Sequence, residues 1–188
     1  MEKKIWIWTG ISVDRELEWL RGPLRALVSG LGVDDSNLAL PFHVSLKMSF
    51  PIGADAAPAV IGCIEDYLSD LRPFSMAVAG IELHDVIAWI RMKENTELNR
   101  IHDGLDALLS AKFGVAQHEY DKDYLFHTTL IMDGDAEKVR RGYEALRGVA
   151  LPETLPVRIF LIGTSNSGAP GSYRVVREID VGDGMRDV

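Results

Sequence analysis

Two short segments of the chain, His43–Leu46 and His127–Leu130, share one order of residues: a histidine, any residue, a residue with a hydroxyl group, and a leucine. A β-strand repeats every two residues, so the histidine and the hydroxyl of each segment would face the same side of a strand. An imidazole accepts or donates a proton near neutral pH, and a hydroxyl can hydrogen-bond to an oxyanion. The pair of segments therefore predicts acid–base chemistry on a phosphate, without a metal ion.

The residues around both motifs indicate strands that line a cleft. Around the first motif apolar and polar residues alternate, which is typical of a strand with one buried and one polar face. The expected polar face consists of His43, Ser45, Lys47 and Ser49. Around the second motif the histidine face is polar only at its centre, because Leu125 and Ile131 flank His127 and Thr129. This pattern favours the floor of a cleft over an open surface.

The composition is that of an ordinary globular protein. The chain has 188 residues, of which 47% are hydrophobic and 26% charged, enough for one domain or two closely fused lobes with a substantial core. The net charge of −8 argues against extensive contacts with nucleic acid, which would require many Lys and Arg residues. A single nucleotide or strand end could still bind in a locally basic cleft.

No segment of the sequence predicts a membrane anchor. No apolar run approaches the roughly 20 residues that a membrane span requires. Residues 1–8 resemble the start of a signal peptide, but polar residues and Asp14 follow soon after, so we interpret this segment as the first strand. The single cysteine, Cys63, cannot form an internal disulfide and favours a reducing compartment. We therefore expect a cytoplasmic protein, and the oligomeric state stays open.

The predicted elements alternate in type along the chain. Asp14 is expected to cap a helix that Gly22–Pro23 should kink or split. The other predicted strands are residues 4–9, 42–50, 74–83, 86–92, 155–164 and 173–181 and the second histidine segment, and the other helices are residues 55–71, 96–113 and 135–148. Helix, strand and strand follow each histidine strand in the same order. This pattern predicts an α+β fold of one domain, residues 1–188, with two pseudo-symmetric lobes, antiparallel sheets lining a central cleft, and helices outside.

With its two motifs in two similar halves, the chain resembles the two-histidine (2H) phosphoesterase superfamily, which includes 2′-5′ RNA ligase-like proteins. His43–Leu46 and His127–Leu130 correspond to the two copies of the family motif, and the order of elements fits over nearly the whole chain. The resemblance implies a hydrolase without cofactor or metal that opens a 2′,3′-cyclic phosphate or a related cyclic or 2′-5′ phosphodiester. It also implies a small nucleotide or an RNA end as substrate.

The chemistry of two imidazoles suggests a role for each candidate residue. One neutral imidazole would take a proton from the attacking water, and the other, protonated, would give one to the departing ribose oxygen. We expect His43 as the base and His127 as the acid, although the sequence does not fix this choice. Ser45, where the family more often has threonine, and Thr129 would hydrogen-bond to the phosphate oxygens. Lys47 would either contact the phosphate or remain solvated.

The sequence leaves two other functions open. The second motif continues as Ile131–Asp133, without the basic residues expected around an RNA site, which favours a nucleotide-sized substrate. The acidic chain is also compatible with a non-catalytic module that binds a nucleotide or phosphate. A metal-dependent hydrolase would use both motif histidines together with Asp133 and Asp135.

The remaining histidines are expected to lie in a turn (His84), at a helix boundary (His102) and in a solvated loop (His118).

Overall fold

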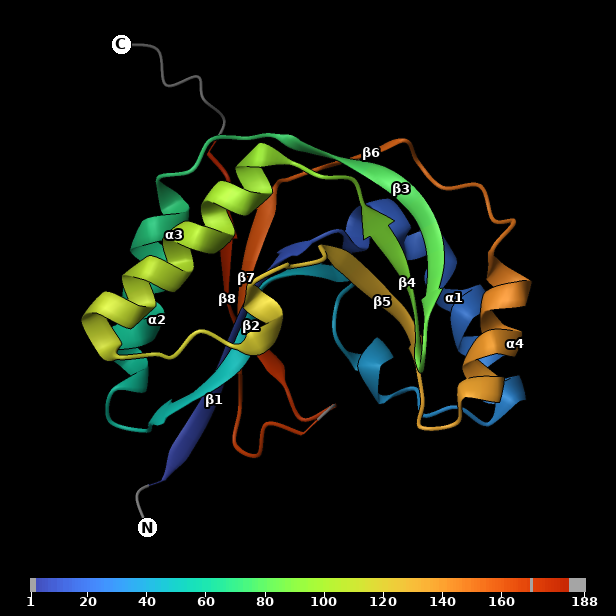
Figure 1. Cartoon of the computed structure of the whole chain (residues 1–188), viewed down its shortest axis with the longest axis horizontal. Coiled ribbons are helices and arrows are strands. Elements are labelled where there is room, and N and C mark those ends of the chain that lie inside the picture. The colour runs from blue at the N-terminus through green and yellow to red at the C-terminus, as the bar shows by residue number, and fades with distance from the viewer. Residues whose placement is uncertain (1–2, 170, 183–188) are drawn as a thin grey trace.

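The computed structural model describes residues 3–169 and 171–182 and consists of two lobes, each built on a four-stranded antiparallel sheet (Figure 1). The strand orders are β2-β1-β7-β8 in one sheet and β5-β4-β3-β6 in the other. The strands are β1 (Lys4–Ser12), β2 (His43–Gly53), β3 (Ser75–His84), β4 (Ile87–Met92), β5 (His127–Met132), β6 (Thr154–Pro156), β7 (Ile159–Ser165) and β8 (Arg174–Asp180). The helices are α1 (Asp14–Leu31), α2 (Ala57–Ser69), α3 (Thr96–Phe113) and α4 (Ala136–Leu146), with short 3-10 segments η1 (Ser36–Ala39) and η2 (Glu119–Asp121).

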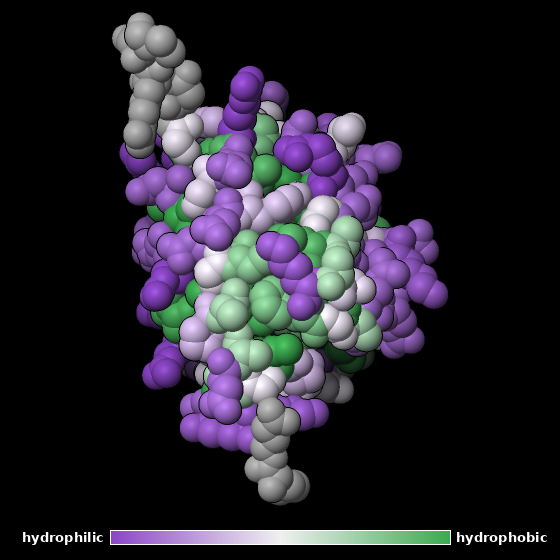
Figure 2. Space-filling view, turned by 90° about the vertical axis from the view of Figure 1, so that its left-hand side faces the viewer, coloured by the Kyte–Doolittle hydropathy of each residue, from purple (hydrophilic) through white to green (hydrophobic). Residues whose placement is uncertain are grey.

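The helices lie outside the two sheets. Helices α2 and α3 pack on the sheet that contains β2, whereas α4 packs on β3, β4 and β5 with α1 beside it (Figure 1). On the side of α2 and α3, hydrophilic residues surround a more hydrophobic central area of the surface (Figure 2). The two histidine strands, β2 and β5, are edge strands of their sheets and lie next to each other where the lobes meet. The predicted α+β fold with two halves and outer helices is confirmed.

Helix α1 shows how the sequence determines one layer and where the prediction was wrong. Leu17, Leu20, Leu24 and Val28 are buried at helical spacing. The helix continues without a break through Pro23, so the predicted alternative of a split is wrong. Pro23 is exposed, so the carbonyl oxygen four residues earlier, which loses its hydrogen bond, can be solvated. Asp14 is the first helical residue and does not cap the helix, because the N-cap residue is Val13 and no side chain caps there.

Other boundaries differ where long-range pairing decides them. The predicted strand 155–164 is two strands, because β6 pairs with β3 in one sheet and β7 pairs with β1 in the other. Strand β2 continues through Pro51, which is tolerated because β2 is an edge strand. Asp135 caps α4, as predicted, and its side chain accepts a hydrogen bond from the backbone N–H of Glu137. Among the described residues, no helix is both long and apolar enough to cross a membrane.

Candidate active site

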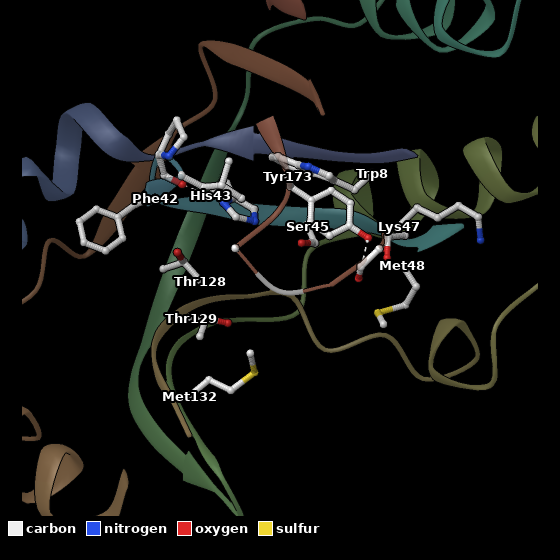
Figure 3. Close-up of a pocket in the computed structure, with 15 residues that line it drawn as sticks. Trp8, Phe42, His43, Ser45, Lys47, Met48, Thr128, Thr129, Met132 and Tyr173 are labelled. Atoms are coloured by element: carbon white, nitrogen blue, oxygen red, sulfur yellow. Dashed lines mark hydrogen bonds between the residues drawn. The ribbon is translucent and has the colours of Figure 1, made fainter. Parts of the chain in front are cut away.

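The first motif histidine stands at the start of β2, and a backbone carbonyl fixes its ring. His43 Nδ1 lies 2.8 Å from the Pro41 carbonyl oxygen, which can only accept, so Nδ1 carries the hydrogen. The indole of Trp8 packs against the imidazole, with ring centres 4.5 Å apart. Nε2 is therefore the nitrogen that can exchange a proton with a substrate, and the imidazole points into a pocket (Figure 3).

Two glycines allow the Trp8 indole to lie against the sheet beneath His43. Trp8 is only 5% exposed. A Cβ at Gly163, on the neighbouring strand β7, would overlap the indole, and a Cβ at Gly10 would lie 3.0 Å from the indole and 2.8 Å from the Val44 carbonyl oxygen. Glycine inside a strand often marks such a close approach. The two glycines therefore leave the space in which the Trp8 indole packs against the His43 imidazole.

The second motif histidine is held in the same way in the other lobe. His127 Nδ1 lies 2.6 Å from the carbonyl oxygen of Leu125. Its ring packs on Trp89 of β4, with ring centres 4.1 Å apart. Each histidine thus donates to the carbonyl two residues before it and rests on a tryptophan from the neighbouring strand, and in both rings Nε2 is left for a substrate.

Burial and nearby charges act differently on the two histidines. Burial lowers the pKa of His43 below 6.5, against the opposing effects of its backbone hydrogen bond and of the charge on Asp14. Burial also lowers the pKa of His127 below 6.5, and the charges of His43, Arg91 and His84 lower it further. The hydrogen bond to the Leu125 carbonyl opposes these effects. Among the side chains that act on the two rings, His43 has a carboxylate, whereas His127 has only an arginine and two histidines.

The pocket of about 290 Å³ beside His43 is lined from both lobes. Four of the five predicted site residues line it: His43, Ser45, Lys47 and Thr129. The fifth, His127, is not among the lining residues but lies two positions before Thr129 on β5. Side chains that complete the lining include Trp8, Phe42, Met48, Met132 and Tyr173. The structure thus brings the two motifs together at one place, and the roles of their residues stay predictions.

Each histidine strand contains an extra residue directly after its hydroxyl residue, and β2 contains a second irregularity, where Met48 and Ser49 together lie opposite Trp8. In the pairing of β2 with β1, Gly10 lies opposite Ser45 and Thr9 opposite Lys47, so Leu46 is extra. In the pairing of β5 with β4, Trp89 lies opposite Thr129 and Ala88 opposite Ile131, so Leu130 is extra. Such an irregularity shifts the alternation of the side chains that follow. The predicted alternation is therefore wrong for the next two residues of each strand: Lys47 and Ile131 are buried, and Met48 and Met132 line the pocket. In β2 the prediction holds again for Ser49, which lines the pocket, and for Phe50, which is buried.

Lys47 is part of a buried ion pair. Its side chain is 2% exposed, and Nζ lies 2.7 Å from Asp121 Oδ2 and 2.5 Å from Asp106 Oδ1. Burial would raise the pKa of Asp121, but hydrogen bonds from Lys47 and from the backbone N–H of His118 outweigh this and hold it below 3.8. The amine of Lys47 lies away from the His43 imidazole (Figure 3). These two carboxylates neutralise the ammonium and disfavour a phosphate contact by Lys47.

His102 belongs to the same buried cluster and is not the helix-boundary residue that the sequence suggested. It is 2% exposed, within α3, and its ring nitrogens lie 2.7 Å from the Leu46 carbonyl oxygen and 3.0 Å from that of Asp121. The ring therefore links α3 to β2 and to η2. His102, Asp106 and Asp121 have ligand atoms within 4.8 Å of one another. The ammonium of Lys47 already lies between the two carboxylates, in the place that a metal ion would take.

The two aspartates of the alternative metal site serve helix α4. Asp135 caps its N-terminus, and Asp133 Oδ1 accepts the backbone N–H of Asp135 at 2.8 Å. Asp133 also lies 4.0 Å from Lys138. This arrangement does not support a metal site made of these carboxylates and the motif histidines.

No protein-family model and no curated protein matches the sequence, but solved structures share its fold. Escherichia coli LigT complexed with NADP+ aligns with a TM-score of 0.60 and 15% identity over 96% of this chain and 99% of LigT. TT0787 of Thermus thermophilus aligns with a TM-score of 0.58 and 16% identity, over 94% of this chain and 97% of TT0787. The chain shares the fold of LigT and TT0787. A further structure, LigT complexed with 3′-AMP, aligns with a TM-score of 0.57 and 16% identity, over 95% of this chain and 98% of LigT.

Two residues that act on the motif histidines could not be found from the motifs. Arg91 lies directly opposite His127 in the pairing of β4 with β5, and its charge acts on that ring. Asp14 acts on His43 from helix α1. Arg91 lies in a strand that the sequence predicted, but its position depends on the register of two strands that helix α3 separates in the chain. No local pattern gives that register.

Proposed function

We propose that the protein is a metal-independent phosphodiesterase that opens a 2′,3′-cyclic phosphate or cleaves a related cyclic or 2′-5′ phosphodiester. The main support is the matched pair of imidazoles, each with Nδ1 donating to a carbonyl and Nε2 left for a substrate. This geometry suits both protonation states. A neutral ring has an accepting Nε2 and acts as a base, whereas a protonated ring donates from Nε2 and acts as an acid.

The charges around the rings favour the opposite assignment to the one that we expected from the sequence. The carboxylate of Asp14 favours the protonated form of His43, while the cationic neighbours of His127 favour its neutral form. In the proposed reaction, His127 takes a proton from the attacking water and His43 gives one to the departing ribose oxygen. Ser45 and Thr129 hydrogen-bond to the phosphate oxygens as negative charge develops there.

The substrate that we propose is nucleotide-sized. The pocket has a volume of about 290 Å³, and the chain carries a net charge of −8, which disfavours a long polyanion. The similar fold of LigT has been solved with NADP+, 3′-AMP and ATP, and we extend this class of ligand to the present chain. Met48 and Met132 give the pocket an apolar part that suits a base or a ribose.

Hydrolysis of the four 2′,3′-cyclic mononucleotides in EDTA tests the proposal. Wild type, His43→Ala and His127→Ala are compared with a control, His118→Asn, which replaces a histidine but keeps a side-chain acceptor for the backbone N–H of Tyr120. Loss of a general acid or base lowers the rate about 10²–10⁴-fold. We expect losses of this size in both motif variants and near-normal turnover in the control.

Other outcomes point to other functions. Nucleotide binding by calorimetry without turnover would support the non-catalytic binding module. Activity of wild type that EDTA abolishes and added metal restores would support the metal-dependent hydrolase. Unchanged turnover in either motif variant would overturn the proposed mechanism.

A further inference from the structure

One peptide group connects Asp14 to the imidazole of His43. The carbonyl oxygen of the Pro41–Phe42 peptide accepts the hydrogen of His43 Nδ1 at 2.8 Å. The N–H of the same peptide donates to Asp14 Oδ1, also at 2.8 Å. A carboxylate, a peptide group and an imidazole therefore form one continuous chain of hydrogen bonds.

We propose that Asp14 is a positioning residue for the reaction, which acts through the Pro41–Phe42 peptide to orient His43 and to stabilise its protonated form. A charged acceptor makes a stronger hydrogen bond than a neutral one. Hydrogen bonds in a chain polarise one another, so a carboxylate on the N–H side makes the carbonyl a better acceptor. The carbonyl then holds the Nδ1 hydrogen more firmly, and the negative charge favours the imidazolium.

The surroundings of Asp14 indicate that its carboxylate is held for this contact. It does not cap α1, and its side chain is 33% exposed. Arg21, further along α1, donates to the same oxygen as the peptide N–H. Arg21 also donates to the carbonyl oxygen of Leu38 at 2.9 Å, and its guanidinium lies 4.6 Å from the ring centre of Phe42. Asp14, the first residue of α1, is thus held in contact with the segment that leads into β2.

The second lobe has the carbonyl but not the carboxylate. His127 Nδ1 donates to the carbonyl of the Leu125–Phe126 peptide, and no carboxylate in the described part of the chain accepts from the N–H of Phe126. The charged groups that act on His127 are Arg91 from β4, His84 from the end of β3, and His43. The proposed link therefore distinguishes two otherwise similar histidines.

The other charged or titratable groups around His43 do not replace Asp14. Arg21 on α1 pairs with Asp14 itself, and His127 on β5 is a second imidazole, whose own pKa is lowered by His43. Tyr173, in the segment before β8, lines the same pocket. Lys47, further along β2, is neutralised by its two carboxylates. Asp14 is the only acidic group that the described structure shows acting on His43.

The test is an NMR titration of the histidine rings, which does not depend on turnover. Asp14→Asn keeps an oxygen acceptor for the Phe42 N–H but removes the charge. Glu18→Gln is the matched control, because Glu18 is the other carboxylate that pairs with Arg21 and is 62% exposed. We expect Asp14→Asn to lower the titration midpoint of His43 by about 0.5–1 pH unit, with a smaller change at His127 and none at either ring in Glu18→Gln.

Arg21→Gln provides a second test, in which the expected shift of the His43 titration midpoint has the opposite sign. Without the guanidinium on Oδ1, the charge of Asp14 is less compensated, so the His43 midpoint should rise. An unchanged His43 midpoint in Asp14→Asn, or shifts of the same sign in both variants, would overturn the inference. Only its consequence for turnover rests on the proposed function: a shift without hydrolysis of cyclic nucleotides would reject that function alone, and hydrolysis without a shift would reject the role of Asp14 alone.

Discussion

Replacing Lys47 with methionine separates a structural role of this side chain from the substrate contact that the sequence suggested. Methionine keeps an unbranched apolar side chain and leaves Asp106 and Asp121 without their shared cation. Removing one partner of a buried ion pair costs about 3–5 kcal/mol. Lys47→Met should lower the free energy of unfolding by that amount. For a chain of 188 residues, this corresponds to a fall in Tm of about 6–20 °C.

The loss should depend on pH. In the wild type the pKa of Asp121 is below 3.8, so this carboxylate contributes stability above its unfolded pKa and loses it as the pH falls through the folded pKa. In Lys47→Met the hydrogen bond from Lys47 no longer offsets burial, so the folded pKa of Asp121 rises. The variant should therefore be most destabilised near neutral pH, and the difference from wild type should shrink in mild acid. Lys47→Met combined with Asp121→Asn should recover part of the loss, because one buried charge is removed.

Urea unfolding followed by tryptophan fluorescence measures these differences at pH 5 and pH 7.5. Lys93→Met is the control, since Lys93 is exposed and surface substitutions usually change stability by less than about 0.5 kcal/mol. The reasoning would be refuted if Lys47→Met had the stability of wild type while hydrolysis of cyclic nucleotides fell by orders of magnitude. That result would identify Lys47 as a phosphate-binding residue.

Two further predictions concern the histidines and their support. The pKa values of His43 and His127 both lie below 6.5, and turnover needs one neutral and one protonated ring. The plot of kcat/KM against pH should therefore be bell-shaped, with its maximum below pH 6.5. A profile that is flat across the histidine range would contradict the scheme. Gly163→Ala should cost about 1–3 kcal/mol in urea unfolding, because the added methyl overlaps the Trp8 indole. Gly62→Ala is the control, since an added Cβ there meets nothing within 4 Å, and equal stability of the two variants would argue against the packing of Trp8.

The parts of the fold that depend on local signals could be predicted from the sequence. Helix α3 has the predicted bounds and ends at Gly114, whose φ of 65° is the left-handed conformation that glycine favours. The turn between β3 and β4 was also found, because polar residues separate two apolar segments. The split of residues 155–164 into β6 and β7 could not be predicted, since it depends on which sheet each half joins. No local pattern specifies that choice.

The same distinction applies to the candidate site. The two histidines and their hydroxyl residues were found because each pair is only two positions apart in the chain. The polar contacts around the histidine strands join distant positions: Asp14 is 28 residues from Phe42, Lys47 is 74 residues from Asp121, and His102 is 56 residues from Leu46. Such contacts are set by how the lobes pack, so the charge environment of each histidine became visible only in the structure.

One backbone feature, the extra residue directly after each hydroxyl residue, accounts for the side chains that the predicted alternation placed wrongly in both strands. A regular strand would put the fourth residue after each histidine, Lys47 or Ile131, on the histidine face. The extra residue in each strand turns that side chain inward instead, so Lys47 reaches its two carboxylates and Ile131 packs against Gly142 of α4. The fifth residue, Met48 or Met132, then faces the pocket. The unit that builds each half of this site is therefore six residues long, from histidine to methionine, and its irregular backbone is the reason that a lysine within the motif serves the core.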